Sequence, residues 1–225
     1  MKFLIRNTHK YLSFFISLQL LLWTISGIYF AFNKIELVRG EQYELMPNHS
    51  FDFRKLNFEI DETANIQITK RLGQDIVIIR GESGNHYLDV NGKSINKLSF
   101  EDAKKIVQDL TTLTPINVEE IKKLKKGSEY RGRELPLYKV LSRNDQGKEI
   151  NVYLNGYSGE VAAIRSLQWR IWDLMWGFHI MDWQARDDIN NLLLKIFSIL
   201  ALFSSLTGIL LFFKVDIESS KHDEK

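Results

Sequence analysis

The chain of 225 residues contains no cysteine. This absence excludes disulfide bonds, thiolate catalysis, zinc sites with cysteine ligands and cysteine-held iron–sulfur clusters within the chain. Charge of one sign is also lacking, because 30 lysines and arginines face 28 aspartates and glutamates, which leaves a net charge of +2. Nucleic-acid binding requires a one-sided basic surface, so the composition argues against a DNA or RNA partner.

Familiar catalytic motifs are lacking as well. The sequence has no zinc-protease histidine pair, phosphate-binding loop or dinucleotide fingerprint. Its nearest approach to a nucleophile elbow is Gly156-Tyr157-Ser158-Gly159, which is followed by Glu160 where the second glycine of that motif belongs. Adjacent acids such as Glu119 and Glu120 are interpreted as solvated faces. We therefore expect a protein that is not an enzyme and has no metal site.

Two apolar runs are present, at residues 11–32 and 190–213, and each is long enough to cross the roughly 30 Å hydrocarbon core of a bilayer. The first has the basic flank of a signal peptide, with Lys2, Arg6 and Lys10 ahead of it. However, it is longer than a signal core of about 7–15 residues and ends in bulky side chains rather than a small-x-small site. We interpret it as a retained membrane anchor.

The charges beside the first run predict the orientation of the chain. Positive charges in a short flank resist translocation, so residues 1–10 are expected in the cytoplasm. Two spans then return residues 214–225 to the cytoplasm, where their polar composition predicts little order. The region between the spans is expected to form an extracytoplasmic domain.

Within this domain, short runs that alternate apolar and polar residues predict strands near Asn65–Arg71, Asp75–Arg80, His86–Val90, Asn117–Leu124, Leu135–Ser142 and Glu149–Leu154. The clearest helix follows Ser99, which forms a capping-box pattern with Asp102 ahead of an apolar face. A weaker helical pattern covers Phe53–Ile60. The order of helix and then strands occurs twice, which predicts an α+β domain of two units, 33–97 and 98–165.

The two expected units share a short repeated motif. It is Tyr87-Leu88-Asp89 before Asn91-Gly92 in the first unit and Tyr153-Leu154-Asn155 before Ser158-Gly159 in the second. A helix, a Val/Tyr-rich strand and a Tyr-Leu strand that closes with Ser158-Gly159-Glu160-Val161 resemble the PepSY domain. The resemblance covers Leu98–Ile164 well and Phe51–Ile95 more loosely.

The membrane-flanking segments resemble PepSY-associated transmembrane proteins. The matching motifs are His9-Lys10, Ser26-Gly27, Thr207-Gly208, Phe178-His179-Ile180-Met181-Asp182 and Arg186-Asp187-Asp188-Ile189-Asn190. Ser13 departs from relatives that often have glycine there, which weakens any inference about close packing at that position.

The PepSY resemblance implies a two-pass protein of a bacterial inner membrane with a periplasmic domain. Such modules occur in protease propeptides with suspected inhibitory roles and in membrane proteins tied to iron and siderophore reduction. The leading hypothesis is an accessory subunit that docks a membrane-protein partner in iron-siderophore reduction or electron transfer. One alternative is an extracytoplasmic regulator of a peptidase or envelope complex, and another is a haem b electron carrier. The chain has no flavin or NADH domain, and a homo-oligomer remains open.

The candidate haem ligands are His9 and His179, because neutral imidazole is a common axial ligand. Antiparallel spans place them at opposite ends of a membrane core of roughly 30 Å, so one chain cannot clamp one haem with both. Ligation requires a second copy or a partner. The simpler interpretation is two ordinary histidines beside the membrane and no cofactor.

Residues 166–189 are expected to form an interfacial helix and a charged collar. The membrane-interface residues are Trp169, Trp172, Trp176 and Trp183. A quinone or porphyrin shelf is the alternative. The collar contains Asp182, Arg186, Asp187, Asp188 and Lys195, with Lys195 snorkelling to pair with the acids. Small and polar residues predicted to pack the helices are Gln19, Ser26, Gly27, Thr207 and Gly208.

Overall fold

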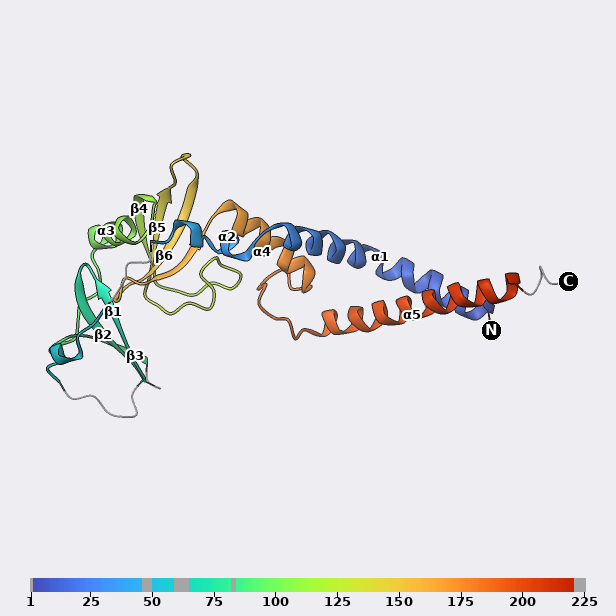
Figure 1. Ribbon diagram of the computed structural model, residues 1–225, viewed down its shortest axis with the longest axis horizontal. Helices are drawn as coiled ribbons and strands as arrows, with labels where there is room; N and C mark the ends of the chain where they lie inside the picture. The colour runs from blue at the N-terminus through green and yellow to red at the C-terminus, as the bar shows by residue number, and fades with distance from the viewer. Residues whose placement is uncertain (1, 46–49, 59–64, 82–83, 221–225) are drawn as a thin grey trace. The chain divides into compact units, whose positions relative to one another are not determined.

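A computed structural model describes residues 2–45, 50–58, 65–81 and 84–220, with side chains of the last helix described to Phe213. The architecture is α+β, with two long apolar helices near the ends of the chain and two antiparallel sheets between them (Figure 1). The chain forms two compact units. One combines Met1–Asn33 with Ile171–Lys225, and the other contains Lys34–Arg170.

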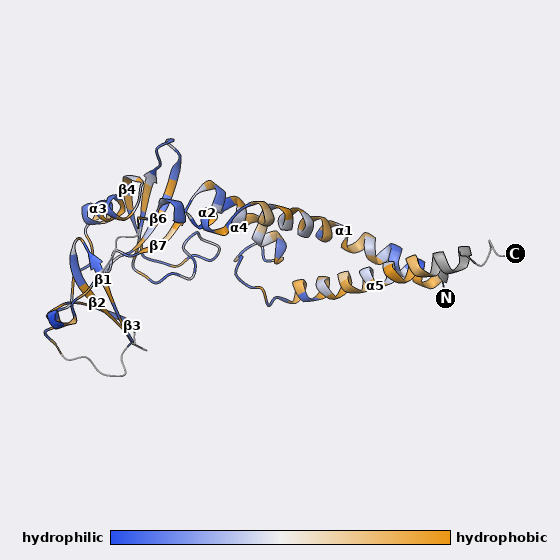
Figure 2. Ribbon diagram, in the orientation of Figure 1, coloured by the Kyte–Doolittle hydropathy of each residue, from blue (hydrophilic) through white to orange (hydrophobic). Residues whose placement is uncertain are grey.

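The first unit is built on α1 (Lys2–Phe32) and α5 (Leu192–Ser220), joined to the C-terminal part of α4 (Leu167–His179). Both long helices are rich in apolar residues, as Figure 2 shows in orange. The segments Phe3–Phe32 and Leu192–Phe213 are each long and apolar enough to cross a membrane. Helix α5 continues as far as Ser220, whereas the sequence predicted little order after residue 213.

Helices α1 and α5 lie side by side and run antiparallel (Figure 1). Phe15 of α1 stacks on Phe197 of α5, with ring centroids 5.7 Å apart. Nearer the two chain ends, the hydroxyl oxygens of Ser13 and Ser204 are 2.7 Å apart. This bond pairs two hydroxyls in an apolar surrounding, and the Ser13 hydroxyl also lies within 3.5 Å of the His9 ring. Ser13 therefore contributes a contact between the two helices.

The second unit contains two sheets. The first has the order β1 (Asn65–Arg71), β2 (Gln74–Gly81) and β3 (Gly84–Asp89), and the second has β4 (Thr114–Ile121), β5 (Leu137–Arg143), β6 (Glu149–Asn155) and β7 (Val161–Arg165). All neighbouring strands are antiparallel. The short helices before β1 are α2 (Ile35–Arg39), η1 (Glu41–Tyr43) and η2 (Phe53–Lys55).

Helix α3 (Phe100–Leu110) packs against the second sheet. The Ser99 hydroxyl accepts the main-chain N–H of Asp102 at 3.1 Å, and the Asp102 carboxylate accepts the N–H of Ser99, which completes the expected capping box. The apolar face buries Ala103, Ile106 and Val107. These residues join alternate residues of β6 in the main core, so the strand is fixed in register.

Strand β6 is buried on both faces. Ile150, Val152 and Leu154 lie in the main core, while Tyr153 belongs to a second cluster with Leu137. Asn151 shares the Tyr153 face and is 8% exposed. A polar side chain in that position needs hydrogen-bond partners, which the loop before β5 supplies.

A tight turn joins β6 to β7. The side-chain oxygen of Asn155 accepts the main-chain N–H groups of Tyr157 and Ser158, and the buried Ser158 hydroxyl accepts the N–H of Glu160. Gly159 adopts a φ of +76°, and a Cβ added there would lie 2.5 Å from Cδ1 of Ile106. The serine of the partial nucleophile-elbow motif is thus part of a turn that only glycine can complete at this distance.

The six expected strands correspond to β1–β6, although β4 begins at Thr114 rather than near Asn117. Strand β7 was not expected. The weak helix at Phe53–Ile60 is only a single 3-10 turn at Phe53–Lys55, and positions 59–60 lie outside the described residues. The main-chain N–H of Asn57 donates to the carbonyl of Val90, the residue after β3, at 3.0 Å. This long-range bond takes the place of the local bond that would have continued a helix.

Candidate functional site

The most suggestive side chain for ligand chemistry is His179 at the end of α4. Its Nδ1 lies 2.7 Å from the Ser26 hydroxyl oxygen. That hydroxyl also lies 2.8 Å from the main-chain carbonyl of Leu22 and 3.1 Å from that of Trp23, and it has a single proton to donate. When the hydroxyl donates to either carbonyl, it accepts Nδ1–H from His179, and Nε2 then keeps a lone pair. The contact with Ser26 holds the direction of the ring.

The end of α4 is held by two further bonds from α1. The indole N–H of Trp23 donates to the carbonyl of His179 at 2.6 Å, and the side-chain amide of Gln19 donates to the carbonyl of Phe178 at 3.1 Å. The last carbonyls of a helix lack partners within the helix, so these donors satisfy groups that a membrane surface would leave unpaired. His179 is consequently held by its side chain and by its backbone.

Aromatic rings form a wall around His179. Trp176 is stacked with it at an interplanar angle of 9° and a centroid distance of 6.3 Å, and Phe30 meets it edge-on at 5.5 Å. Trp172 extends the stack, with its centroid 5.5 Å from that of Trp176. Burial among these groups lowers the pKa of His179, so the neutral form that binds a metal is favoured. No described residue forms a hydrogen bond with Nε2.

His9 has a different environment. Its Nδ1 is 3.0 Å from the Thr207 hydroxyl and 3.1 Å from the Ser204 carbonyl oxygen, and the Ser13 hydroxyl lies within 3.5 Å of Nε2. Its ring is therefore bonded within the contact between α1 and α5. His179 meets α1 at Ser26, and at about 1.5 Å per residue positions 9 and 26 are about 25 Å apart along this helix. The two histidines are not brought together.

The collar is organised by Asp182 rather than by loose solvated charges. Its carboxylate accepts the main-chain N–H groups of Ala185 at 3.1 Å and of Asp187 and Asp188 at 3.2 Å each. Burial opposes the charged form, but these donors outweigh it and hold the pKa of Asp182 below its usual value. Asp182 closes the turn that leads towards α5.

The other residues of the collar differ in their contacts. Arg186 donates to the buried carboxylate of Asp173 at 2.6 Å. Asp187 and Asp188 contribute their main chain to the turn and have exposed side chains. Among the described residues, no acidic side chain pairs with Lys195, which corrects the expectation that this lysine pairs with the collar.

The four tryptophans expected at the membrane interface differ in burial and in their contacts. Trp169 is only 8% exposed and lies beneath the guanidinium of Arg165, whose carbon is 4.3 Å from the ring centroid. It packs inside the unit Lys34–Arg170, so most of its surface is covered by protein rather than open to a headgroup region. Trp172 and Trp176 pack against Phe30, and Trp183 remains 53% exposed.

The residues expected to pack the helices also differ in burial and in how closely they contact a neighbouring helix. Gln19 and Ser26 are buried and bonded to the end of α4, as described above. A Cβ at Gly208 would lie 3.1 Å from Cε1 of His9, so glycine allows that ring to approach α5. Thr207 bonds to the same ring, but a Cβ at Gly27 would meet nothing within 4 Å. Gly27 therefore makes no close contact within the described chain.

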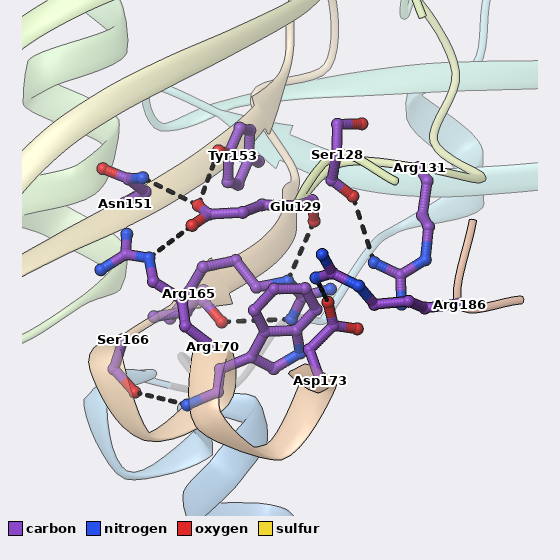
Figure 3. Close-up of polar contacts among 12 residues, drawn as sticks. Ser128, Glu129, Arg131, Asn151, Tyr153, Arg165, Ser166, Arg170, Asp173 and Arg186 are labelled. Carbon is purple, nitrogen blue, oxygen red and sulfur yellow. Dashed lines mark hydrogen bonds and ion pairs between the residues drawn. The ribbon is translucent and has the colours of Figure 1, made fainter. Parts of the chain in front are cut away.

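A second polar cluster surrounds Glu129 in the other unit (Figure 3). Oε2 of its carboxylate accepts from Asn151 at 2.8 Å and from the Tyr153 hydroxyl at 2.9 Å, while Oε1 accepts from Arg170 at 2.5 Å. Burial opposes ionisation, but the bonds from Arg170 and Asn151 outweigh it and lower the pKa of Glu129. Glu129 stays ionised and ties its loop to β6 and to the start of α4.

Arginines gather around this glutamate. Arg165 donates from Nε to the Glu129 main-chain carbonyl at 3.1 Å. Burial, with added repulsion from Arg133 and Arg131, lowers the pKa of Arg165 to about 10. This cluster was not expected from the sequence, where its one signal is Asn151, a polar residue in the middle of an apolar strand.

No family model, curated protein or solved structure matches the chain.

Proposed function

We propose that the chain is a small two-span PepSY-type protein of a bacterial inner membrane, with both ends in the cytoplasm and a periplasmic domain. In this proposal it is a non-enzymatic accessory subunit that docks a membrane partner in iron-siderophore reduction or related electron transfer. The observation that carries the proposal is the state of His179, whose Nδ1 is oriented by Ser26 while Nε2 has no hydrogen-bond partner among the described residues.

The residues present fit a haem group in part. In the tautomer in which His179 donates Nδ1–H to Ser26, its Nε2 lone pair would be suited to hold haem iron, and the flat aromatic rings would border the group. Haem would supply one-electron transfer at this position. His9 is bonded within the α1–α5 contact and is about 25 Å away along α1. One chain thus offers one ligand, and a partner must offer the other.

This single-ligand geometry favours a docking subunit over a self-sufficient haem carrier. The test is purification of the full chain from its own membranes after gentle solubilisation and supply of a haem precursor. We expect a co-purifying membrane protein and a b-type absorption band after dithionite reduction. The band should disappear in His179→Ala and persist in His9→Ala, which serves as the matched histidine control.

Three results would contradict this reading. A folded complex without haem and without a redox partner would remove the electron-transfer role. A band in a partner-free, monomeric chain would support an independent haem carrier. Loss of the band in His9→Ala, together with its retention in His179→Ala, would show that His9 and not His179 holds the haem.

The alternative of an extracytoplasmic regulator is favoured by a different observation, the separate compactness of Lys34–Arg170. Restraint of a peptidase or envelope complex requires only this unit. Affinity purification of the full chain would then recover an envelope peptidase or assembly factor, and capture would be unaffected by His179→Ala. Recovery of a redox membrane protein in place of such a target would exclude this alternative.

A further inference from the structure

The loop between β4 and β5, residues 122–136, concentrates positive charge. Strand β4 ends at Ile121 and β5 begins at Leu137. The loop contains only two acids, Glu129 and Glu134. Its six cationic residues are Lys122, Lys123, Lys125, Lys126, Arg131 and Arg133. A chain of nearly balanced overall charge thus places a local excess of positive charge in one loop.

The acids in and before this loop are already engaged. Glu129 is bonded inward to Asn151, Tyr153 and Arg170. Glu134 accepts from the Asn85 side chain at 2.5 Å. On β4, Glu119 pairs with Lys139 and Glu120 pairs with Lys97. None of these carboxylates forms an ion pair with the loop lysines.

The four lysines point into solvent in two pairs around an apolar residue. Lys122, Lys123, Lys125 and Lys126 are exposed, and across the described residues none has a salt-bridge partner. Leu124 between the pairs is 59% exposed. An exposed leucine flanked by lysines matches a membrane surface, where the apolar side chain enters the headgroup region and the ammonium groups meet phosphates.

The centre of the loop is fixed to the domain. The Glu129 carboxylate accepts three side-chain hydrogen bonds, and the Tyr130 ring lies 5.7 Å from the Tyr153 ring, centroid to centroid. The ordering cost of the loop is thus met on folding rather than on binding, which favours binding by the neighbouring lysines. This differs from an unanchored basic tail.

We propose that Lys122–Lys126 is a docking surface for acidic phospholipids that holds the domain against the bilayer. Charge complementarity supports a phosphate-bearing surface. The domain is also tethered at both ends, because Lys34 and Arg170 are adjacent in sequence to the helical unit with the two membrane-spanning segments. A lipid surface is therefore an obligate neighbour of this protein, whereas an acidic protein partner would have to be recruited.

The absence of cysteine allows a direct test in the full chain. We would introduce Leu124→Cys as the sole thiol, label it with an environment-sensitive fluorophore, and reconstitute the protein into nanodiscs. Discs of phosphatidylcholine alone would be compared with discs containing phosphatidylglycerol. In the acidic discs we expect a blue-shifted emission and at least two-fold weaker quenching by neutral acrylamide. Both effects should be reversed at high salt, because salt screens the attraction between the lysines and the lipid phosphates.

Charge-matched variants assign the effect to this loop. Replacement of Lys122, Lys123, Lys125 and Lys126 by glutamine should abolish the difference between the two lipids. Replacement of four exposed lysines elsewhere, Lys70, Lys93, Lys105 and Lys148, removes the same charge and should preserve it. A label at Asp145→Cys, in the exposed turn between β5 and β6, should give equal signals in both lipids.

Equal emission and quenching of the Leu124→Cys probe in both kinds of disc would overturn the proposal. So would a shift that survives the loop replacement in protein with an unchanged circular dichroism spectrum. Protection of the probe only when an acidic membrane protein is added would assign the surface to that protein and would also overturn it. The proposal rests on the two membrane spans of the proposed function. Its readouts do not involve haem or a redox partner, so its failure and a failure of the proposed electron-transfer role can be told apart.

Discussion

The hydroxyl of Ser26 on α1 and Nδ1 of His179 on α4 lie 2.7 Å apart, and this contact holds the imidazole ring in one direction. The hydroxyl also lies 2.8 Å from the Leu22 carbonyl, and when it donates there the imidazole proton lies on Nδ1 and Nε2 keeps its lone pair. Two residues 153 positions apart in sequence are thus brought together to orient a possible ligand. Neither residue alone indicates this chemistry.

The position of His179 predicts a pH dependence of stability. Burial lowers its pKa in the folded chain, whereas the unfolded residue titrates near 6.5. As pH falls below about 6.5, the unfolded chain takes up the proton before the folded chain does, so the free energy of unfolding decreases. Above that pH the contribution is complete. Thermal unfolding of the solubilised chain at pH 7.5 and 5.5 should therefore show a lower midpoint at the acidic pH.

Tryptophan fluorescence is the suitable probe for this measurement, because Trp23, Trp172, Trp176 and Trp183 belong to the helical unit. His179→Gln should flatten the difference between the two pH values. His86→Gln replaces an exposed histidine of β3 and should leave it intact. A variant at position 179 with the full wild-type pH dependence would show that other groups cause it.

Glu129 is predicted to be the main stabilising acid of the second unit. Glu129→Ala removes the acceptor of three side chains and leaves Arg170 and two buried polar groups without their partner. We expect a loss of about 2–3 kcal/mol in the free energy of unfolding, measured by urea titration with circular dichroism. Glu129→Gln retains an acceptor and should lose less.

Glu119→Ala is the matched control for this prediction. Glu119 is also paired with a cation, Lys139, but at 3.6 Å and with 67% of its side chain exposed. Exposed pairs contribute about 0–1 kcal/mol, so this variant should be nearly as stable as the wild type. Equal losses at the two positions would contradict the structural role assigned to Glu129.

Local sequence signals predicted the parts of the fold that local interactions form. Helix α3 has its capping residues and its apolar face within one short segment, and it begins at Phe100 as expected. Strand β7 has the short sequence VAAIR, in which two alanines give little strand preference. Its conformation depends on pairing with β6, for example Tyr153 with Ala163, and that partner is not evident in the segment itself.

The candidate sites follow the same rule. The sequence identified His179 and Ser26, but it did not show that they are bonded or that His9 is engaged by Thr207. Glu129 was missed because Asn151 and Arg170 are 22 and 41 positions away and belong to different elements. Side-chain type reveals a possible donor or ligand, while tertiary packing decides which atoms remain available.

The turn after β6 gives a test of close packing. Gly159→Ala places a Cβ 2.5 Å from Cδ1 of Ile106 and also imposes a positive φ of +76° on an alanine. We expect a loss of about 2–3 kcal/mol in unfolding free energy, measured by urea titration. Gly147→Ala has a similar φ of +75° but meets nothing within 4 Å, so it should lose only the conformational part, about 1 kcal/mol. Identical losses would mean that Ile106 moves away without cost.

The contact between α1 and α5 can be tested with the other pair of glycines. Gly208→Leu should push the His9 ring away, since even a Cβ at this position lies 3.1 Å from Cε1 of that ring. Gly27→Leu gains the same helix propensity but meets no neighbour within 4 Å, so it separates packing from propensity. Because the chain has no cysteine, Ser13→Cys with Ser204→Cys can report the contact by disulfide formation, as the native hydroxyls lie 2.7 Å apart. Cross-linking yield under mild oxidation should fall several-fold with Gly208→Leu and remain unchanged with Gly27→Leu. Equal yields would show that α1 and α5 approach each other without needing a small residue beside His9.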